Sequence, residues 1–288
     1  MKKRTFFSSI FLVLVLTILF VFSSFCLMSC SKPESKVYID YTKDNNFSVS
    51  HTSYVYNPEA EENEQFGAEI YAPQGANPKY GLLFFVGTSI APENYSYLSE
   101  TLAKKGFLVI IPRVTLAWTY MFYEDQTVVV SNKLLNDYSD IKFFVGRHSQ
   151  GGGACMRFSV DNQNDIMGSI FMSPLCYTEY AVEIDENTTI TKFDTLESST
   201  LPAILLEASG DEVLTSSMRA DAESRMPKDF IHYIITPGAH MSFSQWDDDN
   251  TLNIFNGDGH GMTEEQKAEQ KQTTIEYTFN FIYGIINK

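Results

Sequence analysis

Short apolar segments alternate with amphipathic ones along most of this chain. From Phe66 onward, runs of apolar residues end at glycine or proline, as strands buried on both faces of a sheet do. These runs predict strands at residues 66–72, 82–86, 107–111, 141–145, 167–172, 201–207 and 230–235. Residues 95–105 carry apolar side chains at helical spacing before Gly106, and residues 128–135 and 263–285 also predict helices. The alternation predicts an α/β fold, with a mostly parallel central sheet and helices on both of its faces.

The remaining segments predict further features. The residues before the first of these strands are expected to supply one or two antiparallel edge strands. Residues 177–200 are polar, threonine-rich and acidic, which fits a lid over a functional site as well as a plain surface loop. In the C-terminal helix, Ile275, Phe279 and the pair 281–282 are expected to face the core. No internal repeat or second domain boundary is visible, so residues 41–288 are predicted to form one domain.

The amino terminus has the pattern of an export signal. Three basic residues near the start precede an apolar run over residues 6–22. Residues 27–30 (Leu-Met-Ser-Cys) resemble a bacterial lipobox, in which the cysteine is lipidated and becomes the first mature residue. We therefore predict a signal peptide at residues 1–29, a lipidated tether at residues 30–40, and attachment to a membrane of the bacterial cell envelope through Cys30. The alternatives are an ordinary signal peptide, which would make the protein secreted, and an uncleaved anchor helix.

The composition is that of a folded, acidic protein. Of the 288 residues, 44% are hydrophobic and 20% are charged, and the formal net charge is −15. An acidic surface argues against binding to nucleic acids or to anionic lipids through the folded body. Cys155 and Cys176 lie within the predicted domain, lack metal-ligand spacing and are expected to be buried free thiols. We predict neither a metal nor an organic cofactor.

The most informative motif is the segment at residues 143–153. An apolar run with β-branched and aromatic residues ends in a small-residue turn that presents Ser149, and a helix-compatible segment follows. This is the arrangement of a nucleophile elbow, in which a strained strand-to-helix turn exposes a serine oxygen above a sheet. The usual Gly-x-Ser-x-Gly pattern is not met, because Arg147 stands two residues before the serine. A glycine-rich turn with an inert serine is the alternative interpretation.

A serine nucleophile needs a base, and the base needs an orienting acid. In this type of sheet the acid and then the histidine come from loops at the carboxyl ends of later strands. Asp211 follows the predicted strand at residues 201–207, and His240 follows the one at residues 230–235. The order along the chain therefore predicts that Ser149, Asp211 and His240 form a catalytic triad.

Other residues are alternatives for the base and the acid. His260 lies in a glycine-rich loop that could fold back over the site, so it is the main rival base. His148 is expected to pack beneath the elbow, His232 lies within a predicted strand and His51 precedes the central sheet. The alternative acids are Glu212 and Glu179.

An oxyanion hole requires two N–H donors that point at one position. One donor is predicted to be the main-chain N–H of Gln150, directly after the nucleophile. The other is expected from the loop after the strand at residues 82–86, where Thr88 is the first choice and Ser89 the second.

Two further segments carry weaker signals. The run Asp-Asp-Asp-Asn at residues 247–250 has calcium-ligand side chains, but it lacks the glycine and the final glutamate of an EF-hand loop. We interpret it as a solvated acidic loop. The aromatic residues within 116–123 could line a hydrophobic substrate pocket or pack in the core.

The chain resembles the α/β-hydrolases, in particular the compact bacterial hydrolases related to dienelactone hydrolases. The motifs that carry the resemblance are Gly-Arg-His-Ser-Gln-Gly-Gly at residues 146–152, Gly-Asp at 210–211, Gly-Ala-His at 238–240 and Gly-Asp-Gly at 257–259. The resemblance extends from about residue 81 to residue 281 and implies an α/β-hydrolase fold. The Gly-Asp-Gly motif after the histidine segment also favours His240 over His260.

Together, the triad order and the resemblance predict a serine hydrolase. The expected reaction is hydrolysis of carboxylic esters or related small acyl compounds through an acyl-enzyme. Two departures from the family pattern, Arg147 in the elbow and Val-Gly-Thr at residues 86–88, motivate an alternative. In that alternative the chain is a catalytically weak or inactive binding protein of the cell envelope with the same fold.

Overall fold

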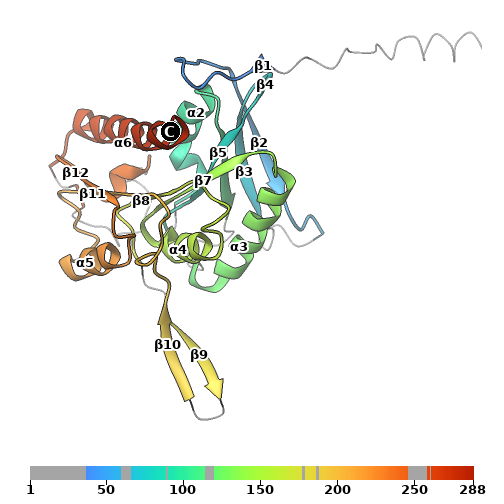
Figure 1. Cartoon of the computed structure of the whole chain (residues 1–288). Coiled ribbons are helices and arrows are strands. Elements are labelled where there is room, and N and C mark those ends of the chain that lie inside the picture. Colours follow the sequence, from blue (N-terminus) through green and yellow to red (C-terminus); the bar gives the residue numbers. More distant parts are fainter. Residues whose placement is uncertain are drawn as a thin grey trace, which may run out of the picture. The chain divides into compact units, whose positions relative to one another are not determined.

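The computed structural model describes residues 37–59, 66–88, 90–113, 120–176, 179–185, 188–245, 258–259 and 261–288. An eight-stranded sheet lies between two layers of helices (Figure 1). The strands are β1 (Val37–Tyr38), β2 (Val49–Val55), β3 (Gly67–Pro73), β4 (Ala76–Asn77), β5 (Tyr80–Phe85), β6 (Leu108–Arg113), β7 (Lys142–His148), β8 (Ser169–Met172), β9 (Glu179–Asp185), β10 (Thr188–Phe193), β11 (Ala203–Ala208) and β12 (Ile231–Ile235).

The large sheet has the strand order β12-β11-β8-β7-β5-β6-β3-β2. The six strands from β12 to β6 run parallel to their neighbours. Strand β3 pairs antiparallel with β6, and β2 pairs antiparallel with β3, so the antiparallel part forms one edge. The prediction of a mostly parallel sheet with an antiparallel edge supplied by early residues is therefore confirmed.

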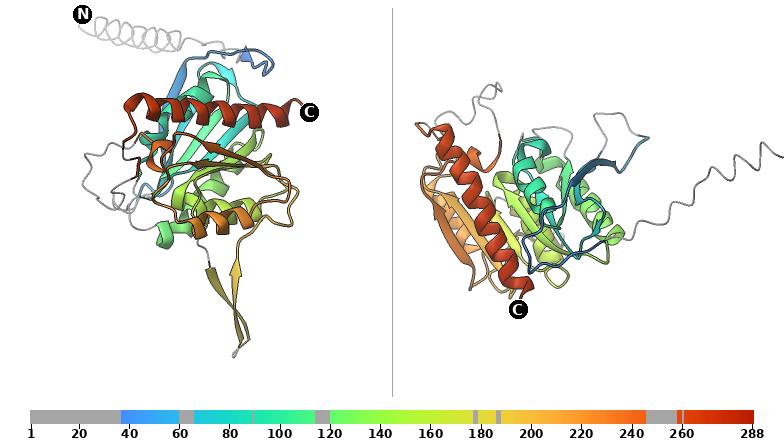
Figure 2. Two further views of the ribbon diagram at one scale, coloured as in Figure 1. Left: turned by 90° about the vertical axis from the view of Figure 1, so that its left-hand side faces the viewer. Right: turned by 90° about the horizontal axis from the view of Figure 1, so that it is seen from above.

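Helices cover both faces of this sheet. The α-helices are α2 (Ser96–Lys104), α3 (Tyr120–Asp137), α4 (Gly152–Asp161), α5 (Ser216–Ser224) and α6 (Glu264–Ile286), and the short 3-10 helices are η2 (Pro92–Tyr95), η3 (Ser149–Gly151) and η4 (Met241–Phe243). Helices α2 and α6 lie on one face, and α3, α4 and α5 lie on the other (Figures 1 and 2). Helix α6 begins with a capping box in which Thr263 and Gln266 satisfy each other's main-chain N–H groups.

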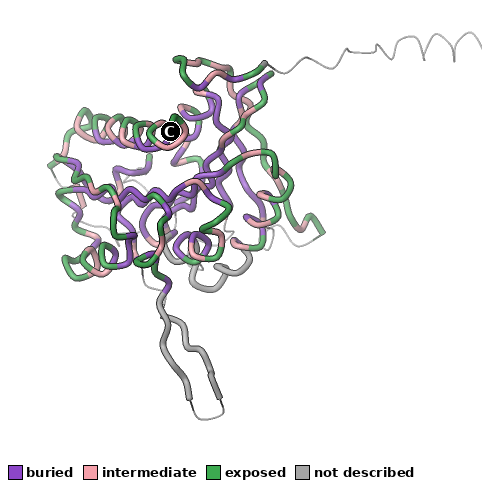
Figure 3. The backbone as a smooth tube through the Cα atoms, in the orientation of Figure 1, coloured by how far each residue is buried: buried purple, intermediate pink, exposed green. Residues whose placement is uncertain are grey.

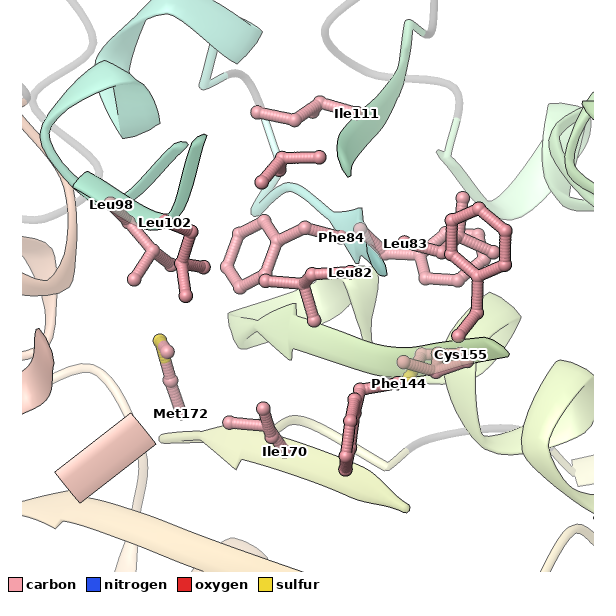
Figure 4. Close-up of a cluster of buried hydrophobic side chains, with 14 of the residues drawn as sticks. Leu82, Leu83, Phe84, Leu98, Leu102, Ile111, Phe144, Cys155, Ile170 and Met172 are labelled. Atoms are coloured by element: carbon pink, nitrogen blue, oxygen red, sulfur yellow. The ribbon is translucent and has the colours of Figure 1, made fainter. Parts of the chain in front are cut away.

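The core lies where the parallel strands meet the helices. The inner strands are buried along almost their whole length, whereas exposed residues are concentrated on the helices and loops (Figure 3). Along β5, Leu82 and Phe84 point toward Leu98 and Leu102 of α2, and Leu83 points away from them (Figure 4). This alternation is the period of two that a strand requires, and burial on both faces explains why β5 is apolar throughout.

The structure also differs from the predictions in three places. The segment at residues 177–200 contains the antiparallel hairpin β9–β10, which extends away from the large sheet (Figure 1). Helix α3 begins at Tyr120, eight residues before the predicted start. In α6 the buried residues include Gln270, Thr274 and Thr278 as well as Phe281 and Ile282, while Ile275 and Phe279 are partly buried. A polar stripe at four-residue spacing is invisible to a search for apolar periodicity.

Several predictions concern residues outside the described ones. The predicted signal peptide and Cys30 lie in residues 1–36, which the structure does not describe. The same is true of Ser89, the acidic run at residues 247–250 and His260. Among the described helices, none combines the length and the apolar character that a membrane crossing needs.

Candidate active site

Strand β7 delivers Ser149 into a sharp turn at the carboxyl edge of the sheet. The serine has a φ of 52°, in the left-handed region that residues with a side chain rarely adopt. The turn is possible because Gly151 approaches β5 closely. A Cβ atom on this glycine would overlap the Val86 carbonyl oxygen and would lie 2.7 Å from that of Phe85. The structure therefore has the strained strand-to-helix geometry of a nucleophile elbow.

The structure brings Ser149, His240 and Asp211 together in a hydrogen-bonded row. The Oγ atom of Ser149 lies 2.7 Å from Nε2 of His240, and Nδ1 of His240 lies 2.8 Å from Oδ2 of Asp211. His240 follows β12 and Asp211 follows β11, so parallel strands carry both loops to the edge that holds Ser149. In this arrangement the carboxylate accepts from Nδ1–H, which leaves Nε2 free to accept the proton of the serine hydroxyl.

Asp211 is held as an ionised acceptor. Burial raises the pKa of its carboxyl, but hydrogen bonds from His240 and from the Leu214 N–H outweigh burial, so the net pKa is lowered. Its Oδ1 atom accepts from the N–H of Val213 at 3.0 Å and of Leu214 at 2.8 Å. Arg219 of α5 donates to the Asp211 carbonyl oxygen at 3.1 Å. The loop that carries Asp211, called the acid loop below, is thereby held through both the side chain and the main chain of Asp211.

The two predicted oxyanion residues lie next to each other. The hydroxyl of Thr88 donates to Oε1 of Gln150, so the first loop and the elbow are joined by a side-chain hydrogen bond. Gln150 is the second residue of η3, where main-chain N–H groups have no partner within the helix. The N–H of Thr88 donates to no other residue that the structure describes. No described residue accepts a hydrogen bond from the main-chain N–H of Gln150 either.

A comparison with protein families identifies the wider group. The model of the alpha/beta hydrolase family matches residues 81–268, which is more than half of the chain. This chain belongs to the alpha/beta hydrolase family. The match spans Ser149, Asp211 and His240, and membership of the family supports a hydrolase. No curated protein sequence matches the chain.

In this hydrolase the main chain on both sides of His240 is held by side chains from the C-terminal part. Asp258 accepts from the N–H of His240 at 2.9 Å and of Met241 at 2.7 Å. Gln270 of α6 accepts from the Ala239 N–H at 2.9 Å and donates to the Ala239 carbonyl oxygen at 2.8 Å. Sequence reasoning missed Gln270, which is 1% exposed, because a glutamine on a helix is usually on the surface.

Asp258 also connects the two loops of the row. Its Oδ1 atom accepts from the N–H of Glu212, the residue after Asp211, at 3.2 Å. The sequence signal for Asp258 was the Gly-Asp-Gly motif at residues 257–259, which served only to choose between histidines. The described part of that loop places the carboxylate of Asp258 against the main chain of the acid and histidine loops.

The other candidate residues lie elsewhere or have other partners. His51 pairs with Glu69 at 2.7 Å on the antiparallel edge, and His232 pairs with Glu207 at 3.0 Å between β12 and β11. His148 is fully buried on the α2 face and contacts the carbonyl oxygen of His240, at 3.0 Å, rather than Ser149. Of the alternative acids, Glu212 is exposed and its main-chain N–H donates to Asp258 at 3.2 Å, and the side chain of Glu179 is not described.

Arg147, the departure from the family pattern, is accommodated on the opposite face of β7 from His148. Its side chain is fully buried, its guanidinium carbon lies 4.4 Å above the ring of Phe171, and Nη2 lies 2.7 Å from the Sγ atom of Cys176. The position that packs against β5 is Gly146, where a Cβ atom would lie 2.8 Å from Phe84. The arginine therefore leaves the elbow geometry intact.

The two cysteines of the domain are free and buried, as predicted. Burial raises the pKa of the Cys155 thiol to about 12, which keeps it protonated at neutral pH. Within the described residues, no group of three or more histidine, cysteine, aspartate or glutamate side chains could hold a metal ion.

Proposed function

We propose that this chain is a serine hydrolase that cleaves carboxylic esters or related acyl compounds through an acyl-enzyme. The observation that carries the proposal is the hydrogen-bonded row, with 2.7 Å between Ser149 and His240 and 2.8 Å between His240 and Asp211. The strained φ of Ser149 and its position at the carboxyl edge of the sheet support the same assignment. The resemblance to dienelactone hydrolases rests on the sequence motifs alone.

The proposed reaction has two halves. The Oγ atom of Ser149 attacks the acyl carbon while Nε2 of His240 takes the hydroxyl proton, and Asp211 stabilises the resulting imidazolium. His240 then gives the proton to the departing alkoxide, which leaves as an alcohol. In the second half, water loses a proton to His240 and attacks the acyl-enzyme. The carboxylic acid is released and the serine recovers its proton.

The main-chain N–H groups of Gln150 and Thr88 are the proposed donors to the oxyanion in both halves. Donors held in advance stabilise the transition state because they need no reorganisation when the charge develops. The hydrogen bond between the Thr88 and Gln150 side chains supports this role, since it holds the two donors close together. The proposed reaction uses no metal and no organic cofactor.

Labelling with a fluorophosphonate probe tests the proposed function directly. The purified full-length chain is expected to be labelled at Ser149, and the Ser149→Ala and His240→Ala variants are expected to lose labelling while keeping their circular dichroism spectra. Cleavage of p-nitrophenyl acetate by the same samples provides the turnover. A folded wild-type chain that is neither labelled nor active would contradict the proposal and favour the binding-protein alternative.

We also infer that Cys30 is lipidated and anchors the protein in a bacterial cell envelope. The inference rests on the residues Leu-Met-Ser-Cys at positions 27–30 after an apolar segment. Growth of a bacterial host with an alkyne fatty acid should label the wild type and the Cys26→Ala control, but not Cys30→Ala. Equal labelling of the Cys30→Ala variant would contradict lipidation at this position.

A further inference from the structure

A second row of buried polar groups links the loop after β5 to His240. This loop carries Gly87 and Thr88 and is called the oxyanion loop below. The N–H of Gly87 donates to the hydroxyl of Tyr95 at 3.0 Å, and that hydroxyl lies 2.8 Å from Nδ1 of His148. On the other side of the ring, Nε2 of His148 lies 3.0 Å from the carbonyl oxygen of His240. Tyr95 and His148 are both fully buried.

The positions of the protons in this row follow from the partners. A carbonyl oxygen can only accept, so Nε2 of His148 must carry a hydrogen and donate it to His240. Burial, together with the neighbouring His240, holds the pKa of His148 well below 6.5, so the ring is neutral and Nδ1 is an acceptor. The hydroxyl of Tyr95 must then donate to Nδ1, and its oxygen accepts from Gly87. Each group in the row has one consistent role.

The row ends at two loops, and the proposed reaction requires these loops to stay at fixed positions relative to each other. Gly87 immediately precedes Thr88, the proposed oxyanion donor. At the other end, the carbonyl oxygen belongs to His240 itself, the proposed base. His148 immediately precedes Ser149 in the chain, so the row is also tied to the nucleophile. A Cβ atom on Gly87 would lie 3.2 Å from Nδ1 of His148, which shows how closely the oxyanion loop packs on the ring.

Ring packing restricts the row further. The ring centroids of His148 and His240 lie 4.8 Å apart, and His148 also packs on Phe243 at 5.6 Å. The ring of Tyr95 packs on Phe84 of β5 at 4.9 Å. Buried side chains with both hydrogen bonds and ring contacts have little freedom to move, so displacement at one end is transmitted to the other.

We propose that Tyr95 and His148 are positioning residues that set the oxyanion loop and His240 at fixed places relative to Ser149. This inference rests on the proposed function. It adds residues that neither attack the substrate nor transfer a proton in the proposed mechanism. The pair acts through the main chain of Gly87 and His240, so its loss should misplace both the oxyanion donor and the base.

The principal test is Tyr95→Phe, with Tyr41→Phe as the matched control. The hydroxyl of Tyr41 also accepts from a main-chain N–H, that of Lys79 at 3.0 Å, and donates to the buried Gly106 carbonyl oxygen at 2.9 Å. Both substitutions therefore remove a hydroxyl oxygen that accepts from a main-chain N–H and donates to a second described residue. We expect Tyr95→Phe to lower kcat about 10-fold or more with little change in KM. Tyr41→Phe should lower the melting temperature without changing kcat.

Two substitutions of His148 separate the ends of the row. Glutamine can place an amide N–H near the position of Nε2 and keep the bond to His240, whereas asparagine is too short and reaches only the position of Nδ1. We expect His148→Gln to retain more of kcat, and a faster rate of fluorophosphonate labelling, than His148→Asn. If His148 had a purely structural role, the activities of the two variants would follow their melting temperatures and would not depend on whether the amide can reach the position of Nε2.

Nitrogen-15 NMR of the wild type tests the proton positions without any variant. The expected spectrum shows His148 neutral, with the hydrogen on Nε2, between pH 6 and 8. A hydrogen on Nδ1, or a doubly protonated ring, would overturn the inference. So would a labelled, active wild type in which Tyr95→Phe and Tyr41→Phe have equal kcat. An unlabelled wild type would instead overturn the proposed function, and the inference with it.

Discussion

The described residues include two clusters of a serine, a histidine and a carboxylate, and of these two the one at the carboxyl edge has the order that serine hydrolysis requires. At the carboxyl edge, the imidazole of His240 lies between Ser149 and Asp211. On the antiparallel edge, Glu69 occupies the middle, with His51 at 2.7 Å and the hydroxyl of Ser53 at 2.8 Å from its Oε2. The same three types of group are thus hydrogen-bonded in a different order, with the carboxylate rather than the imidazole in the middle.

The order decides the chemistry. In the edge cluster the hydroxyl of Ser53 donates to the carboxylate of Glu69, which Arg113 also contacts at 3.1 Å, so the partner of this hydroxyl is a carboxylate and not an imidazole base. Ser53 lies in the regular strand β2, directly opposite Glu69 of β3. Ser149 instead lies in a strained turn beyond the end of β7. A sheet face places side chains for packing, whereas loops at strand ends can aim them at a common point.

The largest expected difference between the clusters is in ester hydrolysis. Ser149→Ala and His240→Ala should each lower kcat/KM by about 10⁴-fold or more, because the nucleophile and its base act as a unit. Ser53→Ala and His51→Ala should leave kcat/KM unchanged, because neither hydroxyl nor ring in that cluster contacts the site. The measurement is p-nitrophenyl acetate hydrolysis at saturating and subsaturating substrate. A large loss of activity in Ser53→Ala would remove the distinction between the clusters.

The two carboxylates should separate activity from stability. Asp211→Asn preserves the shape but removes the charge that orients His240, so kcat should fall by about 10³- to 10⁴-fold with a small change in melting temperature. Glu69→Gln should leave kcat unchanged and lower the free energy of unfolding by about 1–3 kcal/mol, since the carboxylate is 1% exposed and has several donors. Urea unfolding and steady-state kinetics on the same preparations provide both quantities. The reverse pattern, with activity lost in Glu69→Gln and kept in Asp211→Asn, would contradict the catalytic role of Asp211.

A smaller effect is expected from the carboxylate that ties the acid loop to the histidine loop. Asp258→Ala removes the acceptor of the His240, Met241 and Glu212 N–H groups and should lower kcat about 10-fold by loosening both loops. Asp40→Ala is the control, because Asp40 also accepts a main-chain N–H, from Thr42 at 3.1 Å, in an exposed turn. Equal kinetics for the two variants would indicate that the Asp258 contacts do not position the base.

The smallest expected effect is on the pH dependence of stability. The folded-state pKa of His148 lies below its unfolded value of about 6.5, so below that pH the unfolded chain binds a proton that the folded chain does not. The contribution of His148 to the free energy of unfolding is therefore at its full value above about pH 6.5, and it decreases progressively as the pH falls below that value. Among the described residues, the titratable groups that face it are Tyr95, His240 and Asp211.

Replacement of His148 should remove this contribution. Between pH 6.5 and 5.5, the unfolding free energy of the wild type should fall more steeply than that of His148→Gln, by up to about 1.4 kcal/mol per pH unit. Urea unfolding at each pH measures the difference, and both proteins share every other titrating group. Parallel pH profiles would indicate that His148 can be protonated within the fold.

Much of the architecture was predictable because strands buried on both faces leave a strong local pattern. The apolar runs around Leu82, Val109 and Phe144 are typical of strands buried on both faces, and the structure contains strands at each of them. The boundaries differ by a few residues, as with Pro112, which remains within β6 and pairs with Ala68 of β3. The hairpin β9–β10 was not predicted, because a polar, threonine-rich segment fits a loop equally well.

The sequence by itself determined the order of Ser149, Asp211 and His240 at the ends of three strands of the parallel part of the sheet, since parallel strands bring their carboxyl ends to one edge. Only the tertiary structure decided which side chains hold that row in place. Gln270 is buried because α6 packs against the main chain of Ala239, with which its side chain forms hydrogen bonds. Tyr95 of η2 contacts His148 of β7. Arg147 and Cys176 become neighbours in the same way. Such contacts join residues far apart in the chain, and no local pattern of apolar and polar positions encodes them.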